Sequence, residues 1–333
     1  MLAKLGDFGH FRAILRYNTF MIRFREREAG ESSSALLYLP HDVNSFRGLH
    51  VVMPRIEAGG PSIVVRINPD LLEHDVRTPS ERENVPIEET HALVLAGGIA
   101  SRMKNSDPKQ LIPITLSRRL IDFSMDMLAN AGIQGVTFSC VRYTVDPIVR
   151  HVGRNAEVNP IYGKSRFFVK EEPEGVIPAI RDPIEGFNMR DKPLIIVHGD
   201  EVLYADLRKM YEYHTSNHNP ITACMIDDPM SKNTVFLQTD EDARVVRVGR
   251  YPNDVTLSSA SAFGYRYTLT GLWIIDPDYI DFLKSSKSAD SFIFEVCKEG
   301  LLYGYRNTGL FFNCNTPEDI ETTRRALEQS SHG

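Results

Sequence analysis

From His91 onward, short apolar runs alternate with segments whose apolar residues recur at helical spacing. Strands that are apolar on both faces and separated by helices are typical of sheets that helices cover on both sides. This alternation therefore predicts an α/β fold with a mostly parallel sheet. The predicted buried strands include "ALVLAGG" (92–98), "GVTFSCV" (135–141) and "PLIIVHGD" (193–200).

Three helices are predicted between and after these strands. Apolar residues recur at helical spacing over 120–131, and Gly132 ends that pattern. A second helix is predicted over 207–214. In "NTPEDIETTRRALEQ" (315–329), Thr316 has the character of an N-cap and is followed by a proline and two acids. This segment predicts a helix that begins after Thr316.

The first 88 residues follow a different pattern. Short runs rich in β-branched and aromatic residues are separated by Gly, Pro, Ser and Asn, which is typical of antiparallel strands. A polar, proline-bearing segment over 77–90 has the composition of a linker. We therefore expect a β-rich N-terminal extension over 1–88, to which the sequence assigns no role, and an α/β domain over 89–333.

Composition excludes several classes of protein. Of 333 residues, 38 are Lys or Arg and 44 are Asp or Glu, so no general basic field is available to hold nucleic acid. The four cysteines are widely spaced, which indicates neither a disulfide framework nor a zinc site. No stretch reaches the ~18 apolar residues of a membrane span. We expect a cytoplasmic protein that binds neither nucleic acid nor membranes.

The end of the first predicted strand could bind an anion. Ligands in open α/β sheets bind beyond the carboxyl ends of the strands. There, Gly97 and Gly98 allow close approach of the backbone, and Arg102 and Lys109 follow in the next segment. Phosphate is the expected anion, because exposed N–H groups beside cations attract it. The alternative is a strand-to-helix turn with solvated charges.

Two further residues could hold a metal ion. Asp200 ends the strand at 193–200, and Asn313 precedes the capped helix. A carboxylate and an amide oxygen are hard ligands of the kind Mg²⁺ takes while keeping waters and substrate phosphates. The alternatives are an N-cap or turn role for Asp200 and a turn role for Asn313.

Together these segments resemble the sugar-1-phosphate nucleotidyltransferase family, the nucleotide-sugar pyrophosphorylases with an NTP-transferase domain. The resemblance covers about 91–328 and implies a Rossmann-like, mixed, mostly parallel sheet flanked by helices. It also implies transfer of a nucleoside monophosphate from NTP to a sugar or cyclitol 1-phosphate, with release of pyrophosphate. Its motifs, in chain order, are "LAGGIASRM", "DPKQLIPI", "EEPEGVIPAI" (171–180), "VHGDEVLYADL" (197–207), "TGLWIIDPD" (270–278) and "FFNCNTPEDI" (311–320).

The resemblance implies roles for individual residues. Arg102 is expected to hold the leaving pyrophosphate, and Lys109 to neutralise charge on the α-phosphate. Asp200, which also counts as catalytic, and Asn313 are expected to hold Mg²⁺. The nucleotide-binding residues implied are Leu95, Ala96, Gly97, Gly98, Glu171 and Gly175, and the acceptor-binding residues implied are Thr270, Gly271 and Arg250.

Three positions depart from the family's pattern and concern the acceptor more than the reaction. Ala100 stands where the family has a third glycine, and Pro178 stands where a small residue is usual. The family's acceptor-side lysine is replaced by Tyr251, which leaves Arg250 as the residue expected to substitute.

The nucleotide loop "KEEPEG" resembles that of purine-using members, which leans towards GTP and a GDP-linked product. Glu171 or Glu174 could accept the guanine N–H groups, and the alternative is a solvated loop surface. The histidines are expected to have packing or surface roles, since transfer to a phosphate requires no histidine; they are His91, His198, His214 and His218.

Two other functions stay open at this point. A catalytically silent homologue could bind nucleotide or sugar phosphate and regulate a partner, and the N-terminal extension is then a possible surface for a partner or for a homo-oligomer. A dinucleotide-dependent oxidoreductase fits less well, because "AGGIAS" lacks the G-x-G-x-x-G spacing.

Overall fold

The computed structural model describes residues 85–98, 108–227, 235–250 and 264–330, together with six short strands within residues 2–66. The chain divides into two compact units, Met1–Glu83 and Asn84–Gly333, and each is described by itself.

In the first unit, all described strand pairs are antiparallel, as the pattern of short β-rich runs predicts. One sheet has the order β1-β4-β3-β2, and β5 pairs with β6. The strands are β1 (Leu2–Lys4), β2 (Ile14–Tyr17), β3 (Phe20–Phe24), β4 (Ser34–Leu37), β5 (His50–Met53) and β6 (Ile63–Arg66).

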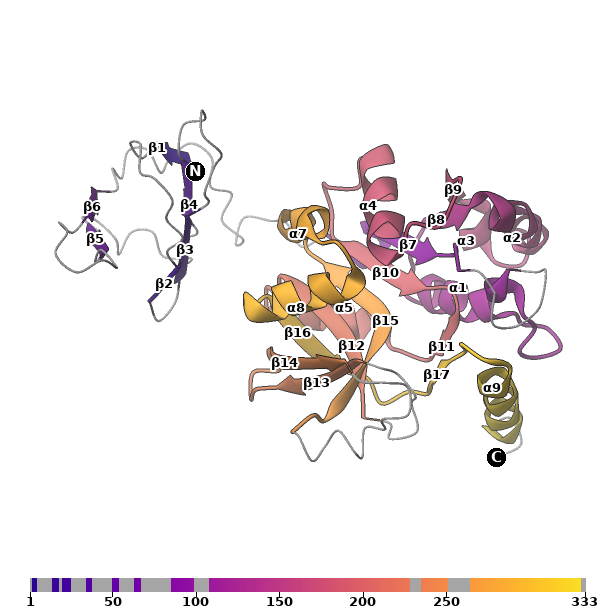
Figure 1. Cartoon of the computed structure of the whole chain (residues 1–333). Helices are drawn as coiled ribbons and strands as arrows, with labels where there is room; N and C mark the ends of the chain where they lie inside the picture. Colours follow the sequence, from indigo (N-terminus) through magenta and orange to yellow (C-terminus); the bar gives the residue numbers. More distant parts are fainter. Residues whose placement is uncertain are drawn as a thin grey trace. The chain divides into compact units, whose positions relative to one another are not determined.

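The second unit is built on a mixed sheet of nine described strands with the order β14-β13-β15-β10-β7-β8-β9, in which β12 pairs with β15 and β16 (Figure 1). The β10-β7-β8-β9 part is parallel throughout, whereas β15 is antiparallel to β10. The strands are β7 (His91–Leu95), β8 (Val136–Val141), β9 (Ser165–Lys170), β10 (Leu194–His198), β12 (Ile221–Ile226), β13 (Val235–Thr239), β14 (Val245–Arg250), β15 (Tyr267–Ile275) and β16 (Leu302–Arg306).

Both faces of this sheet are buried under helices. In β10, Leu194 and Ile196 belong to one buried cluster, and Ile195 and Val197 belong to another on the opposite face. Because successive side chains of a strand point to opposite faces, a strand apolar at every position must be covered on both sides. The Rossmann-like mixed sheet flanked by helices is therefore confirmed.

Different helices supply the two faces. The cluster with Ile195 and Val197 contains residues of α1 (Leu120–Asn130), α2 (Arg142–Asn155) and α5 (Leu207–Ser216). The cluster with Leu194 and Ile196 contains residues of α4 (Val176–Gly186), α7 (Asp281–Ser285) and α8 (Ala289–Lys298). Two further α-helices are α3 (Pro160–Gly163) and α9 (Pro317–Ser330), and the short 3-10 helices are η4 (Ile87–Glu89), η6 (Lys109–Leu111) and η7 (Pro277–Tyr279).

The sequence-predicted helix ends are confirmed. α1 ends just before Gly132, which has φ of +85°. At α9, the Thr316 hydroxyl accepts a hydrogen bond from the Asp319 N–H at 3.1 Å, and the Asp319 carboxylate accepts one from the Thr316 N–H at 2.8 Å. This reciprocal arrangement satisfies N–H groups that the helix itself leaves unpaired.

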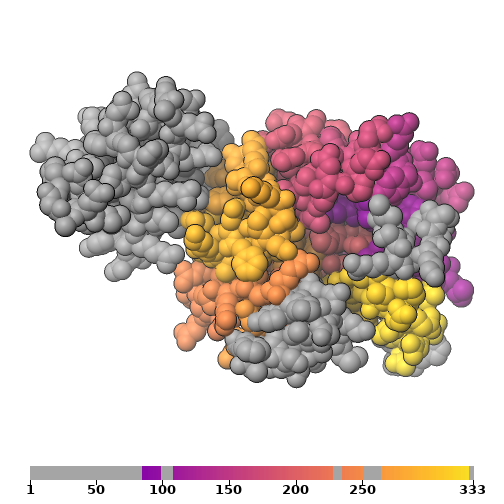
Figure 2. All heavy atoms as spheres, in the orientation of Figure 1, coloured from indigo at the N-terminus to yellow at the C-terminus, as the bar shows by residue number. Residues whose placement is uncertain are grey.

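A small strand pair brings two distant motifs together. β11 (Glu201–Leu203) follows β10 directly and pairs antiparallel with β17 (Phe311–Asn313), with Glu201 opposite Asn313. Figure 2 shows this unit hollowed between rose-coloured residues before position 200 and the yellow C-terminal residues. The pairing places the end of β10 beside the segment that leads into α9.

A buried histidine predicts an acid-sensitive fold. His214 is 2% exposed, its Nδ1 is 2.9 Å from the Thr222 hydroxyl, and burial lowers its pKa to about 3. The unfolded chain takes up this proton near pH ~6.5, whereas the folded chain does not until about pH 3, so stability should fall as pH drops through that window. The slope contributed is at most about 1.4 kcal/mol per pH unit.

We therefore expect His214→Gln to flatten the loss of unfolding free energy between pH 7 and pH 5, measured by urea unfolding of the full chain. His218→Gln, at an exposed position, is the matched control. An unchanged slope in the His214 variant would contradict the assignment.

Candidate active site

A cavity of about 300 Å³ lies at the carboxyl end of β10. Residues from β10, β11, β13, β14, β15, β17, α4 and α8 line it. The lining includes residues that the sequence singled out for metal or acceptor binding, namely Asp200, Asn313, Arg250, Thr270 and Gly271. The fold thus gathers around one cavity residues that lie more than a hundred positions apart in the chain.

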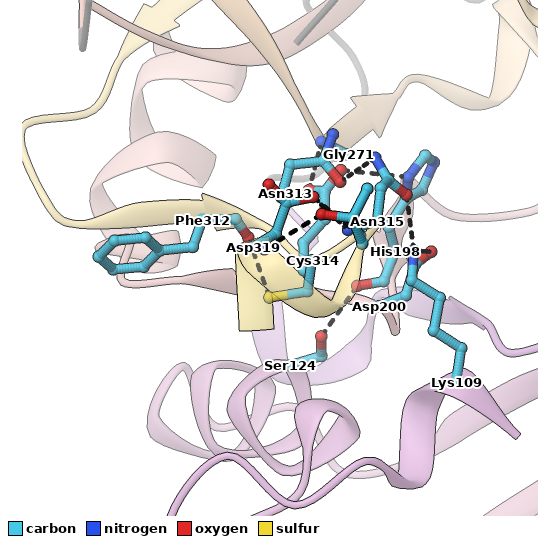
Figure 3. A network of polar contacts seen from close by, with 12 residues as sticks. Lys109, Ser124, His198, Asp200, Gly271, Phe312, Asn313, Cys314, Asn315 and Asp319 are labelled. Atoms are coloured by element: carbon cyan, nitrogen blue, oxygen red, sulfur yellow. Dashed lines mark hydrogen bonds and ion pairs between the residues drawn. The ribbon is translucent and has the colours of Figure 1, made fainter. Parts of the chain in front are cut away.

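Lys109 lies at the edge of this cavity within a polar network (Figure 3). Its ammonium donates hydrogen bonds to Asp200 Oδ2 at 2.7 Å and to Asn315 Oδ1 at 2.6 Å, and its side chain is 7% exposed. The Asn315 amide donates in turn to Asn313 Oδ1 at 2.6 Å. The network therefore joins the opening loop, the end of β10 and the segment before α9 through one buried cation.

The charge of Asp200 is stabilised by this environment. Burial by itself would raise the pKa of the Asp200 carboxyl, but the charge and hydrogen bond of Lys109, together with His198, hold that pKa below its ordinary value. Asp200 is thus an ionised carboxylate at neutral pH. A Cβ atom placed on Gly98 would lie 3.9 Å from Asp200 Oδ2 and 3.0 Å from Gln110 Nε2, so a side chain here would crowd the end of Gln110.

A second pair of titratable groups faces the cavity. Glu201 Oε2 accepts a hydrogen bond from the Gly271 N–H at 2.9 Å, and its other oxygen lies 3.4 Å from His198 Nδ1. Burial alone would lower the pKa of His198, but the hydrogen bond with Glu201 and the carboxylates of Glu201 and Asp200 raise it overall. The cavity therefore presents an imidazole that favours its charged form beside the Asp200 carboxylate.

The residues present fit Mg²⁺. In the part of the chain that the structure describes, no group of three or more His, Cys, Asp and Glu side chains could hold a metal by itself. Mg²⁺ does not need one, because it is usually bound by one or two protein oxygens together with waters and substrate phosphates. The carboxylate of Asp200 and the amide oxygen of Asn313, which share the cavity, form such a partial set.

Arg250 and Asp290 form another part of the cavity wall. Arg250, at the end of β14, is paired with Asp290, near the start of α8. Asp290 was not predicted from the sequence. A guanidinium already held by a carboxylate can exchange that partner for a phosphate, since each is an anion that offers two oxygens to the planar guanidinium fork.

Some residues that were predicted to bind a substrate do not line the cavity, or have their polar groups bonded within the protein. Glu171 pairs with Arg142 at 2.7 Å, with side-chain exposures of 77% and 73%, as a solvated loop residue would. The Thr270 hydroxyl donates to the carbonyl of Cys224. Gly175 has φ of +103° and allows the turn into α4.

The remaining nucleotide-loop predictions concern backbone groups. The carbonyl of Leu95 accepts a hydrogen bond from the Gly199 N–H, and the carbonyl of Ala96 accepts one from the Thr144 hydroxyl, which ties the loop to its neighbours. Gly97 is adjacent to Val141. Arg102, Ala100 and Tyr251 lie outside the described residues.

The sequence reasoning missed His198, Glu201 and Asn315. His198 was expected to have a packing or surface role, but it lines the cavity. Each of the three lies within two positions of a predicted residue in the motifs "VHGDE" and "NCNT". Their proximity in the chain to Asp200 and Asn313 was the available signal.

Substitution of Gly271 should have a severe effect that a second substitution, at His198, partly reverses. A Cβ atom at this position would lie 2.3 Å from His198 Cγ, so the ring occupies the space that a side chain would need. We expect Gly271→Ala to displace His198. For the reaction that the sequence motifs imply, pyrophosphate release should fall by roughly 10- to 100-fold, which is the measurement. The double variant Gly271→Ala/His198→Ala removes the clash and should recover the part of the loss that is steric; a double variant no better than Gly271→Ala alone would contradict this packing.

The family follows from comparison with known sequences. The pattern of the family described as Nucleotidyl transferase matches residues 91–330. The chain belongs to this family, and the resemblance seen in its motifs is confirmed.

The individual relatives have low sequence identity to this chain and match only part of it. A glucose-1-phosphate adenylyltransferase from Thiobacillus denitrificans is 25% identical over 209 residues, which cover 57% of this chain and 46% of that protein. A candidate mannose-1-phosphate guanyltransferase from Sulfolobus acidocaldarius is 29% identical over 144 residues, covering 41% of this chain and 38% of that protein. The match thus spans less than half the length of these relatives.

The fold is shared with a solved structure. A candidate glucose-1-phosphate thymidylyltransferase from Bacillus anthracis, solved in complex with a sucrose, superposes with a TM-score of 0.60 at 16% identity. The superposition covers 71% of this chain and 94% of that one. Separately, no helix among the described residues is long and apolar enough to cross a membrane.

Proposed function

We propose that the protein is a nucleotidyltransferase that joins a sugar or cyclitol 1-phosphate to the nucleoside monophosphate of an NTP and releases pyrophosphate. The observation that carries this proposal is the shared cavity of Asp200 and Asn313 with Lys109 at its edge. A buried cation beside an ionised carboxylate suits a reaction in which two polyanions must meet. The family and the names of its relatives support the same reaction class.

In the proposed reaction, an oxygen of the acceptor phosphate attacks the α-phosphorus of the NTP. The new P–O bond forms as the bond between the α-phosphorus and the bridging oxygen breaks, and pyrophosphate leaves with that electron pair. The attacking oxygen is already an anion, so no general base is required. Lys109 offsets negative charge at the α-phosphate. Arg250 releases Asp290 and holds the acceptor phosphate in its place.

Asp200 and Asn313 are the residues proposed to hold Mg²⁺. The ion would neutralise phosphate charge and orient the two phosphates. Arg102 remains the proposed partner of the pyrophosphate, and the backbone at Gly97 and Gly98 remains the proposed nucleotide cradle.

GTP is the nucleotide we propose first. The acidic loop over 170–175 supports this choice, although Glu171 and Glu174 are each paired with a basic residue in the protein, Arg142 and Lys170 respectively. For either to accept the guanine N–H groups, that ion pair must open. The Glu171–Arg142 pair is exposed, so opening it costs about 1 kcal/mol or less, whereas Lys170 is largely buried and also pairs with Asp182.

The proposal is tested by measuring pyrophosphate release with each NTP, Mg²⁺ and a panel of sugar and cyclitol 1-phosphates. The expected result is turnover with one purine nucleotide and a restricted set of acceptors. The second candidate is a catalytically silent homologue, favoured by Tyr251 at the family's lysine position. An NTP that raises the melting temperature while no combination releases pyrophosphate would establish that candidate instead.

A further inference from the structure

The cavity has two chemically different parts. Its polar end consists of His198, Asp200, Glu201, Asn313 and Asn315, which lie in or next to the network around Lys109. Its other part is made by side chains from α4, α8, β10, β13 and β15. We call this the apolar part; its residues are Val176, Ile177, Ile180, Ile196, Val235, Leu269, Trp273, Ile275, Ala289, Phe292 and Ile293.

The apolar part is continuous with the core. Most of its residues belong to one buried cluster on the α4 and α8 face of the sheet. Trp273 and Phe292 face each other there, with ring centroids 6.0 Å apart and planes inclined at 49°. A surface of this kind binds apolar ligand groups, because their binding removes apolar area from water. It offers few hydrogen-bonding partners to a ligand hydroxyl.

Polar groups next to the apolar part are already engaged. The Thr270 hydroxyl donates to a carbonyl of β12, and the Gly271 N–H donates to Glu201. Arg250, paired with Asp290 in this structure, is the proposed partner of the acceptor phosphate. Among the described residues of the apolar part, Trp273 alone carries a side-chain hydrogen-bonding group, and it is a single donor. A ligand hydroxyl buried here without a partner would weaken binding by roughly 5- to 150-fold.

We propose that the acceptor of this site is a sugar 1-phosphate whose ring carries an apolar group, such as a deoxy methyl or the methyl of an acetamido substituent. The phosphate binds between the polar end and Arg250, and the apolar group enters the apolar part. A cavity of about 300 Å³ is at the lower end of the range for ligand sites and suits one monosaccharide-sized ligand. This inference rests on the proposed function for its acceptor phosphate.

The test compares matched acceptors in the glucose, galactose and mannose series. In each series, the parent 1-phosphate is compared with its 6-deoxy form and its 2-acetamido form, and both kcat/KM for pyrophosphate release and the calorimetric Kd are measured with the full chain. We expect one substituted form to exceed its parent by about tenfold or more in kcat/KM, with a matching ratio in Kd. The two substituted forms distinguish a methyl at carbon 6 from an acyl group at carbon 2.

The outcomes separate this inference from the proposed function. Turnover with parent hexoses equal to or faster than every substituted form would overturn the inference and leave the proposed function standing. A binding preference for a substituted form without turnover of any acceptor would overturn the proposed function and support the inference. Absence of both binding and turnover across the panel would overturn both.

A variant pair locates the effect in the cavity. Phe292→Tyr adds one hydroxyl to the wall of the apolar part, and we expect it to reduce the preference for the substituted acceptor by about threefold or more. Phe187→Tyr makes the same change in a partly buried ring that packs against the same cluster without lining the cavity, and should keep the preference. Equal effects of the two variants would contradict the assignment of the apolar part.

Discussion

Asp200→Asn is expected to lower kcat for pyrophosphate release by roughly 1,000-fold or more. The substitution keeps the shape of the side chain and can still accept the hydrogen bond from Lys109, but it removes the charge proposed to hold Mg²⁺. Because Lys109 and His198 keep the pKa of Asp200 low, the carboxylate is available for a metal throughout the neutral range. Circular dichroism should show an unchanged fold.

The control for this variant is Asp191→Asn, since Asp191 is a surface aspartate that also pairs with a basic residue, His91. It should retain full turnover. Loss of activity in both variants would indicate a general effect of removing an acidic group, and full activity of Asp200→Asn would remove Asp200 from the proposed metal site.

Lys109→Met should have the second largest effect, a fall in kcat of roughly 100- to 1,000-fold. The variant removes the cation proposed to act at the α-phosphate and also leaves Asp200 and Asn315 without their shared donor. Breaking a buried pair is destabilising, although the 25% exposure of the Asp200 side chain limits that cost. We therefore expect a lower melting temperature as well, measured together with kcat and KM.

Two comparisons make the Lys109 prediction specific. Lys209→Met removes an exposed lysine that pairs with Asp206 and should leave turnover unchanged. The double variant Lys109→Met/Asp200→Asn should lose much less than the product of the two single losses, because the residues act on the same phosphates as one unit. Fully multiplicative losses would mean that the two side chains act independently.

The fold could be predicted from the sequence because its strongest signals are local. A strand such as β10, apolar at every position from 194 to 197, requires cover on both faces, and Thr316 followed by Pro317 and two acids defines a helix start without reference to the rest of the chain. These signals need no knowledge of long-range contacts.

The site was only partly predictable because side-chain direction depends on distant pairings. Asp200 and Asn313 share a cavity through the pairing of β11 with β17, which joins segments more than a hundred residues apart. From the sequence, a histidine that ends an apolar strand is expected to be a packing residue. Only the structure shows that the His198 ring occupies the space beside Gly271 that a side chain at position 271 would need. Likewise, a motif identifies Thr270 but does not show that its hydroxyl donates to the carbonyl of Cys224.

The apolar part of the cavity could not be foreseen for the same reason. Ile177 and Phe292 belong to helices separated by six described strands in the chain order, and helical periodicity shows only that each is buried. Whether a buried residue faces the core alone or also borders a cavity depends on how the two helices sit on the sheet.

The central claim, that Asp200 and Asn313 together hold a divalent ion beside the triphosphate, is tested most directly by crystallography. Crystals grown with Mn²⁺ and a non-reacting NTP analogue would reveal the ion by its anomalous signal. The account predicts one ion within about 2.0–2.3 Å of an oxygen from each of the two side chains, with phosphate oxygens as further ligands. An ion bound by the triphosphate alone, with both side chains turned away, would contradict it.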